Sequence, residues 1–124
     1  MTDNNRHGRS LCPIACTLDI IGDKWTLIVI RDLFTGKKRY KEFTDSPEKI
    51  PTNILAERLK RLETYELVEK RARNPNSRWV EYFLTPKGEA LLPVLQEICK
   101  WGNMHIEKTW LPPEWFMEKK VQDD

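Results

Sequence analysis

The chain contains 124 residues, of which 40% are hydrophobic and 32% are charged, and its formal net charge is +2. A chain of this length and composition is expected to form one domain with a modest core. No stretch approaches the roughly 18 consecutive apolar residues of a membrane-spanning helix. Residues 1–10 lack the apolar core of a secretory signal. We therefore expect a cytoplasmic protein with no membrane partner.

The positive charge is concentrated in one part of the chain. Residues 37–78 contain twelve Lys or Arg and seven Asp or Glu, a surplus of +5, so the remaining residues carry −3. Such a local surplus is typical of a surface that binds nucleic acid. Any single charged cluster is more often a solvated surface, so the interpretation depends on which elements carry the charge.

Two helices are expected after a flexible arm at residues 1–10. Pro13 occupies the first position of a short helix, and Gly22 ends it. Asp23 can cap a second helix that continues to residue 35. Its β-branched residues suit a strand, but its apolar residues continue beyond the length of a strand, which favours a helix. A helix that is apolar nearly all round should lie at the centre of the domain.

A short third helix is expected over residues 39–44, followed by a chain breaker and by a fourth helix over residues 52–66. Leu55, Leu59 and Leu62 recur at helical spacing in the fourth helix and should face the core. Two helices of this kind, joined by a short turn, form a helix-turn-helix. The outward face of the fourth helix carries Thr52, Asn53, Ala56, Glu57 and Lys60, with Arg58 and Arg61 on its flanks.

Residues 67–73 and 79–85 are expected to pair as an antiparallel hairpin. Apolar residues alternate in the second segment with the period of a strand, and Asn74 and Pro75 favour a turn between the two segments. The predicted fold class is mainly α with a small β-hairpin (α+β). A positive helix followed by a positive hairpin is typical of a winged helix-turn-helix, whose helix fills a DNA major groove beside the hairpin.

A long final helix is expected over residues 85–108, with a bend at Pro93. It completes a winged-helix domain over residues 11–108 and leaves a tail, residues 109–124, without an assigned role. The helix carries an apolar stripe, which consists of Leu91, Leu92, Leu95, Ile98, Cys99 and Gly102. Because an exposed apolar stripe is a liability, we expect part of it to pack inward. The rest should pair with Ile14, Leu18 or the equivalent helix of a second chain.

The predicted DNA contacts divide between base edges and phosphates. Thr52, Asn53, Ala56 and Glu57 are candidates for base reading, because Asn can pair with adenine, Glu can accept from cytosine, and methyl groups can touch thymine. Phosphate contacts supply affinity but little sequence information. The phosphate candidates are Lys38, Arg39, Tyr40, Arg58, Lys60 and Arg61. In the hairpin the candidates for DNA contact are Arg71, Arg73, Asn76 and Arg78, and the guanidinium groups of the three arginines suit either phosphates or a minor groove.

Other functions are weaker alternatives. An enzyme is disfavoured because the sequence has no Gly-rich phosphate loop, no HExxH and no CxxC. A winged helix used only for protein contact, without DNA sequence specificity, remains the main alternative. Salt-sensitive DNA binding would separate it from a DNA-binding protein.

Four stretches of the sequence resemble the HxlR-type branch of bacterial winged-helix transcriptional regulators, relatives of the MarR type. They are Cys12-Pro13 with residues 17–26, Arg31-Asp32-Leu33, residues 50–63, and Val80-Glu81-Tyr82 with residues 85–88. The resemblance implies a homodimeric DNA-binding repressor or activator, whose dimer is built from the N-terminal and C-terminal helices. Such a dimer reads a pseudo-palindrome with half-sites about one helical turn, roughly 10 base pairs, apart.

Cys12 is a candidate sensor. Three cysteines are an odd number, unlike a disulfide framework, and we expect thiols. Cys12 lies at a helix start, where the helix dipole lowers a thiol pKa and favours the reactive thiolate. In several members of the resembled family, a cysteine at the matching position senses oxidants or electrophiles; a structural thiol is the alternative. We expect no cofactor and no metal, since His7 and His105 have no useful spacing to Cys12 and Cys16.

Overall fold

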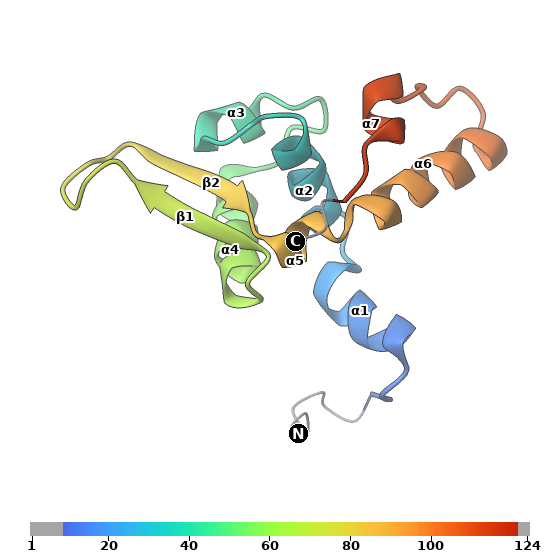
Figure 1. Ribbon diagram of the computed structural model, residues 1–124, viewed down its shortest axis with the longest axis horizontal. Helices are drawn as coiled ribbons and strands as arrows, with labels where there is room; N and C mark the ends of the chain where they lie inside the picture. Colours follow the sequence, from blue (N-terminus) through green and yellow to red (C-terminus); the bar gives the residue numbers. More distant parts are fainter. Residues whose placement is uncertain (1–8, 122–124) are drawn as a thin grey trace.

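The computed structural model describes residues 9–121, so most of the arm predicted at residues 1–10 lies outside the described residues. Within this part of the chain, seven helices accompany one two-stranded antiparallel sheet (Figure 1). In chain order the elements are α1 (Pro13–Ile21), α2 (Thr26–Phe34), α3 (Tyr40–Thr44), α4 (Thr52–Thr64), β1 (Val68–Ala72), β2 (Val80–Leu84), α5 (Pro86–Glu89), α6 (Leu92–His105) and α7 (Glu114–Glu118). The predicted fold class, mainly helical with one hairpin, is confirmed.

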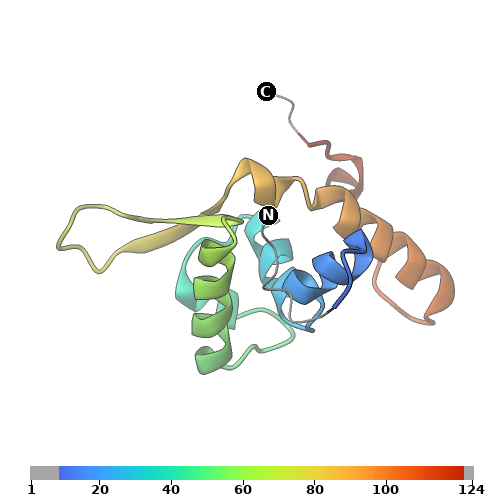
Figure 2. The same cartoon turned by 90° about the horizontal axis from the view of Figure 1, so that it is seen from below.

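Helix α2 lies at the centre of the domain, as its apolar sequence predicts. Val29 and Ile30 are buried and pack in one core with Leu55 and Leu59 of α4 and with Phe43 of α3. The hairpin projects from one side of this helical body, as Figures 1 and 2 both show. Its register pairs Val68 with Leu84 and Ala72 with Val80. None of the helices between residues 9 and 121 is long and apolar enough to cross a membrane.

The start of α2 differs in detail from the prediction. The regular helix begins at Thr26, and not at Asp23. Asp23 nevertheless caps it, because Asp23 Oδ2 accepts hydrogen bonds from Trp25 N at 2.9 Å and from Thr26 N at 3.0 Å. Partial burial disfavours the ionised carboxylate, but these bonds and those from the side chains of Thr26 and Arg58 outweigh it. The pKa of Asp23 therefore lies well below its ordinary value.

A buried polar cluster holds the turn between α3 and α4. Ser46 donates a hydrogen bond to Asp32 of α2, and both side chains are almost completely buried. Lys37 Nζ donates to Ser46 Oγ at 2.7 Å. Arg31 bridges Asp32 and Glu48 with bonds of 2.8 Å, and this contact lowers the pKa of Glu48. Since buried polar groups are costly unless they are paired, this cluster favours one geometry of the turn.

The prediction of one bent helix over residues 85–108 is wrong. The chain forms two helices, α5 and α6, separated by a turn at Ala90 and Leu91. Pro93 is the physical reason, because it has no N–H and its ring clashes with the carbonyl four residues earlier. The predicted cap of the first helix is present: Thr85 Oγ1 accepts from Gly88 N at 3.0 Å.

The tail beyond residue 109, which had no assigned role, packs on the domain. Phe116 of α7 is buried, with its ring centroid 6.3 Å from that of Phe34 in an edge-to-face arrangement. Gln96 Nε2 of α6 donates to Phe116 O at 3.0 Å and to Lys119 O at 2.8 Å. Trp110 remains exposed, so only part of the aromatic content of the tail joins the core.

Candidate nucleic-acid interface

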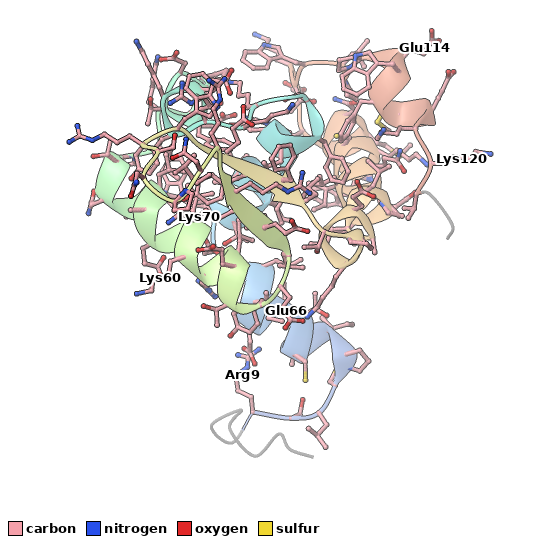
Figure 3. The ribbon with its side chains drawn as sticks, turned by 60° about the vertical axis from the view of Figure 1, so that its left-hand side comes forward. Arg9, Lys60, Glu66, Lys70, Glu114 and Lys120 are labelled. Carbon is pink, nitrogen blue, oxygen red and sulfur yellow. The ribbon has the colours of Figure 1, made fainter. Side chains whose placement is uncertain are left out.

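Helix α4 presents a polar face to the solvent. Thr52, Asn53, Ala56, Glu57 and Lys60 are all exposed, and Figure 3 shows Lys60 pointing away from the domain. The leucines of the opposite face are buried in the core. The helix therefore has the two faces that its sequence predicts, and the candidates for base reading share one accessible surface.

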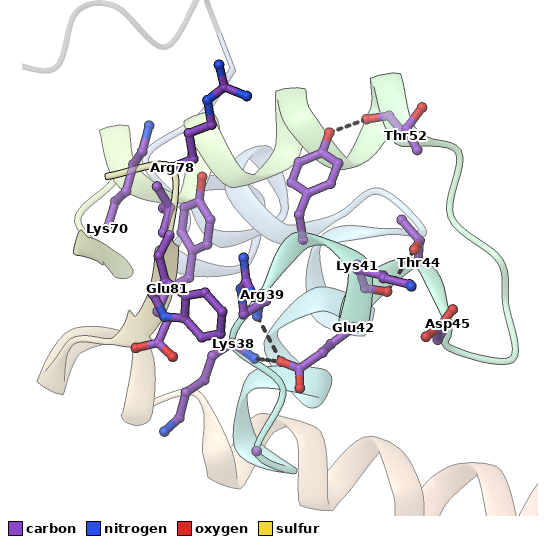
Figure 4. A pocket seen from close by; sticks show the side chains of 15 residues that line it. Lys38, Arg39, Lys41, Glu42, Thr44, Asp45, Thr52, Lys70, Arg78 and Glu81 are labelled. Carbon is purple, nitrogen blue, oxygen red and sulfur yellow. Dashed lines mark hydrogen bonds between the residues drawn. The ribbon is translucent and has the colours of Figure 1, made fainter. Parts of the chain in front are cut away.

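A groove of about 1090 Å³ lies beside this surface, between α3, the start of α4 and the hairpin (Figure 4). Its lining contains more cations than carboxylates. The cations are Lys38, Arg39, Lys41, Lys70 and Arg78. We call it the basic groove. Lys38, Arg39 and Arg78 were predicted as phosphate contacts, whereas Lys41 and Lys70 were missed because they join these residues only through the packing of α3 against the hairpin.

Backbone contacts hold the wall of the basic groove. Tyr82 N of β2 donates to Lys38 O at 2.9 Å, which attaches the segment before α3 to the second edge of that strand. Glu42 Oε1 accepts from Lys38 N at 2.8 Å and from Arg39 N at 2.9 Å and so caps α3. These backbone bonds lower the pKa of Glu42, so its carboxylate is ionised and committed to the helix start.

Trp79 and Phe83, which lie just before and within β2, stack against three guanidinium groups, one from the start of α3 and two from the hairpin. The Arg39 guanidinium lies 3.4 Å from the centre of the Trp79 ring, and that of Arg73 lies 4.3 Å from the same ring. Arg71 stacks on Phe83 at 4.0 Å. Each such contact contributes on the order of 0.5–1 kcal/mol at an exposed site. This role of Trp79 and Phe83 was not predicted from the sequence, although the two residues alternate along the segment that pairs with Arg71 and Arg73.

The turn of the hairpin is exposed and locally ordered by its own side chains. Asn74 Oδ1 accepts from Asn76 N at 3.0 Å, and Ser77 N donates to Asn74 O at 3.0 Å. Arg78 follows the turn and is exposed at the rim of the basic groove. Asn76 itself lies in this turn and does not line the basic groove.

Three other phosphate candidates already have partners within the chain. Arg58 Nε donates to Asp23 Oδ2 at 2.8 Å, and Arg61 Nη2 donates to Asp19 O at 2.8 Å. Tyr40 donates its hydroxyl proton to Thr52 O at 2.7 Å, which joins α3 to the first residue of α4 (Figure 4). Phosphate contacts by these three side chains remain predictions, and any such contact has to extend or replace these bonds.

Cys12 lies immediately before α1 and is exposed. Hydrogen bonds from the backbone N–H groups of Ala15 and Ile14 lower the pKa of its thiol. Burial instead raises the pKa of Cys99. The direction of this shift is the one expected for a thiol at a helix start, and the role of Cys12 as a sensor stays a prediction. Among residues 9–121, no group of three or more potential ligands could hold a metal ion.

The predicted dimer stripe divides into two parts. Leu92 and Leu95 lie in the core of the subunit itself, and Leu91 and Cys99 pack against that core. Ile98 is 51% exposed, like Leu18 of α1, and Ile14 is 70% exposed. Ile14, Leu18 and Ile98 line an apolar groove of about 550 Å³ between α1 and α6, which lie side by side in Figure 2. Gly102 is half-buried and does not line this groove.

The helix-turn-helix, the hairpin and the basic groove define a winged helix-turn-helix protein. Residues 20–110 match the model of the HxlR-like helix-turn-helix family, and the chain belongs to that family. Its members YodB and YkvN of Bacillus subtilis are named HTH-type transcriptional regulators, and membership of this family confirms the expectation that the protein is not an enzyme.

Relatives of known structure share most of the chain. The HTH-type transcriptional regulator YodB of Bacillus subtilis is 38% identical over 101 residues, which cover 81% of this chain and 90% of YodB. The redox regulator HypR in its reduced form superposes with a TM-score of 0.70 at 33% identity, covering 77% of this chain and 94% of HypR. PA1607 superposes with a TM-score of 0.71 at 32% identity, covering 86% and 83%. YodB has been solved reduced, diamide-treated and quinone-bound.

The two cysteine environments predict different alkylation profiles. In a Cys16→Ser background, the rate at which iodoacetamide modifies Cys12 should rise at a lower pH than the rate for Cys99, because a lowered pKa populates the thiolate sooner. Mass spectrometry of tryptic peptides over a pH series measures both rates in one sample. A midpoint for Cys12 at or above that of Cys99 would contradict this assignment.

Proposed function

We propose that the protein acts as a homodimeric repressor that binds a pseudo-palindromic duplex DNA through α4 and the hairpin. The observation that carries this proposal is the position of the basic groove directly beside the exposed polar face of α4. A helix of this kind fits the major groove, and a cationic cleft beside it suits the neighbouring phosphate backbone. Repression follows if the bound dimer covers a promoter.

Base reading is assigned to the first half of α4. Asn53 has an exposed amide suited to adenine, Glu57 an exposed carboxylate suited to cytosine, and Ala56 a methyl group suited to thymine. Lys60, one turn further along, is exposed and has only its charge to offer, so it suits a phosphate. The chain thus offers specificity and affinity from neighbouring turns of one helix.

Backbone binding is assigned to the basic groove and the hairpin. Arg71 and Arg73 stack on aromatic rings, which already restrict each side chain to few rotamers. Less side-chain entropy is therefore lost when these residues bind a phosphate. A duplex carries a charge about every 1.7 Å of its axis, so several of these cations can each meet a phosphate. A winged helix used only for protein contact would not show the salt dependence that such contacts impose.

Asn53→Ala and Lys60→Ala should weaken DNA binding in different ways. Asn53→Ala should change which duplexes a randomised library yields, with a loss of about 1–3 kcal/mol for the wild-type site. Lys60→Ala should weaken all duplexes alike and reduce the slope of log K against log salt by about one unit. Fluorescence anisotropy at several salt concentrations measures both effects.

A matched control for the lysine is Lys120→Ala, which removes the same charge from the opposite side of the domain (Figure 3). It should leave the affinity and the slope unchanged. Wild-type protein that fails to retard any duplex at low ionic strength would refute DNA binding altogether and favour the protein-contact alternative.

The dimer is assigned to the apolar groove between α1 and α6. Ile14, Leu18 and Ile98 expose apolar surface there, and such surface is stabilised when a second copy covers it. A two-fold interface of this kind also brings two α4 helices onto one duplex. Leu92 and Leu95 are left out of the interface, because their side chains already fill the core of the subunit.

Leu18→Glu should therefore convert the dimer to a monomer, since a carboxylate buried in an apolar interface has no partner. Sedimentation velocity of the wild type and the variant at micromolar concentration measures this change. Tyr65→Glu, which places the same charge on an exposed aromatic residue at the end of α4, should remain dimeric. A wild-type protein that sediments as a monomer would contradict the assignment.

We further propose that Cys12 makes DNA binding responsive to oxidants or electrophiles. The proposal is supported by its exposure, by the lowered pKa of its thiol, and by the redox forms in which YodB and HypR have been solved. Its thiolate can bond to an electrophilic carbon, or two thiols can be oxidised to a disulfide while diamide is reduced to the hydrazine. The alternative is a thiol that only supports the start of α1.

A change in DNA affinity on treatment with diamide should depend on Cys12. The affinity of the wild type should shift on treatment and recover with dithiothreitol, whereas Cys12→Ser should bind DNA normally and not respond. Cys99→Ser serves as a comparison, because its loss abolishes the response only if Cys99 is the second thiol. Unchanged DNA affinity in wild-type protein whose Cys12 is shown to be modified would end the sensor proposal.

A further inference from the structure

Arg58 differs from the other polar residues of α4 in its surroundings. Its side chain is only 18% exposed, and its Nε donates to Asp23 Oδ2 at 2.8 Å. Asp23 also accepts from the backbone N–H groups of Trp25 and Thr26. One carboxylate therefore caps α2 and holds α4, although the two partners are 35 residues apart in the chain. Arg61 adds a weaker contact, with its Nη1 at 3.9 Å from Asp23 Oδ1.

The same guanidinium has a second partner on the exposed face of α4. Arg58 Nη1 donates to the carboxylate of Glu57, whose side chain is 56% exposed. Glu57 is one of the residues assigned to base reading. Arg58 thus lies between a partly buried anchor just before α2 and a side chain that faces the proposed DNA.

This geometry decides between two roles for Arg58. As a phosphate contact, Arg58 would present its charge to the backbone of the duplex, and a lysine could replace it. As a bridge, it uses Nε and Nη1 for two carboxylates at once, which requires the planar fork of a guanidinium and which the single ammonium of lysine cannot reproduce. Both of these donors already have carboxylate partners in the free protein.

We propose that Arg58 is a positioning residue for sequence recognition: it sets the rotation of α4 through Asp23 and orients Glu57 toward a base edge, and it does not bind a phosphate. The proposal rests on DNA binding by α4 as proposed above. It also explains how a carboxylate can lie on a DNA-binding face. An unpaired Glu57 would be repelled by nearby phosphates, and no ion pair would fix the direction of its side chain.

The test compares Arg58→Lys, Asp23→Asn and the phosphate reference Lys60→Ala on two probes. These are the duplex that wild-type protein selects from a randomised library and a scrambled duplex of equal length and composition. Arg58→Lys keeps the charge and breaks the bridge; Asp23→Asn removes the negative charge that anchors Arg58, and it changes no residue of the DNA face. Both should lower the ratio of specific to non-specific affinity by about 10-fold or more, while the salt slope stays that of wild type.

A second readout separates orientation of Glu57 from a general loss of structure. Selection with Glu57→Gln should identify the base pair that Glu57 reads, and Arg58→Lys should relax the preference at that base pair more than at the others. In the Glu57→Gln background, Arg58→Lys should have little further effect there. A uniform relaxation at all positions would show a merely structural role and overturn the proposal.

Two results would overturn the positioning role of Arg58. Normal discrimination by Arg58→Lys, or a salt slope that falls by about one unit in Arg58→Gln with discrimination unchanged, would make Arg58 a phosphate contact. Thermal unfolding shows whether each variant is folded. If Arg58→Gln does not fold, the discrimination measured for Asp23→Asn distinguishes a positioning role of Arg58 from a phosphate contact. Failure of wild-type protein to bind any duplex would refute the proposed function instead, so the two failures are distinguishable.

Discussion

The geometry of the candidate interface depends on how one helix, α4, is held against α2. The leucines of its inner face pack on Val29 and Ile30 and supply most of the attraction, at roughly 25 cal/mol per Å² of apolar surface buried. Apolar packing is not directional, so it leaves the rotation of the helix less well defined than its attachment. Directional contacts limit that rotation: the Asp23–Arg58 ion pair on one flank, and the bond from Tyr40 to Thr52 O at the start of the helix.

Aromatic rings, in addition to carboxylates, hold the cations of the charged surface. Arg39 and Arg73 lie against Trp79, and Arg71 lies against Phe83, so aromatic faces hold three guanidinium groups in the candidate interface. An aromatic ring fixes the direction of a guanidinium without cancelling its charge. In contrast, the cations of the buried cluster beneath the turn, such as Arg31, are paired with carboxylates. Of the three stacked guanidinium groups, that of Arg71 is also paired with a carboxylate, because Arg71 Nε lies 3.0 Å from Glu69 Oε1, so ring stacking and ion pairing act together there.

Features that follow from a local sequence pattern can be predicted from the sequence, whereas features that depend on tertiary packing cannot. The two faces of α4 and the alternation in the hairpin follow from helical and strand periods, because burial of one face is a local property of the pattern. The break before α6 was expected only as a bend, although Pro93 lacks the donor that a continuous helix needs. The pairing of Asp23 with Arg58 could not be predicted, since their approach depends on how α2 and α4 cross. The division of the α6 stripe between Leu95 and Ile98 depends in the same way on tertiary packing.

Helix α1 lies between the proposed sensor, Cys12, and the proposed DNA-reading helix, α4. Its N-terminal end carries the exposed Cys12, and its last turns contact α4, because Asp19 O accepts a bond from Arg61. Arg9 pairs with the carboxylate of the same aspartate at 2.7 Å, so the segment before Cys12 and the helix α4 meet at one residue. A change at the thiol therefore has a short physical route to α4 within one subunit, through contacts that are partly exposed and individually weak. Weak contacts of this kind suit a response that has to be reversible, because they can rearrange without unfolding the core beneath them.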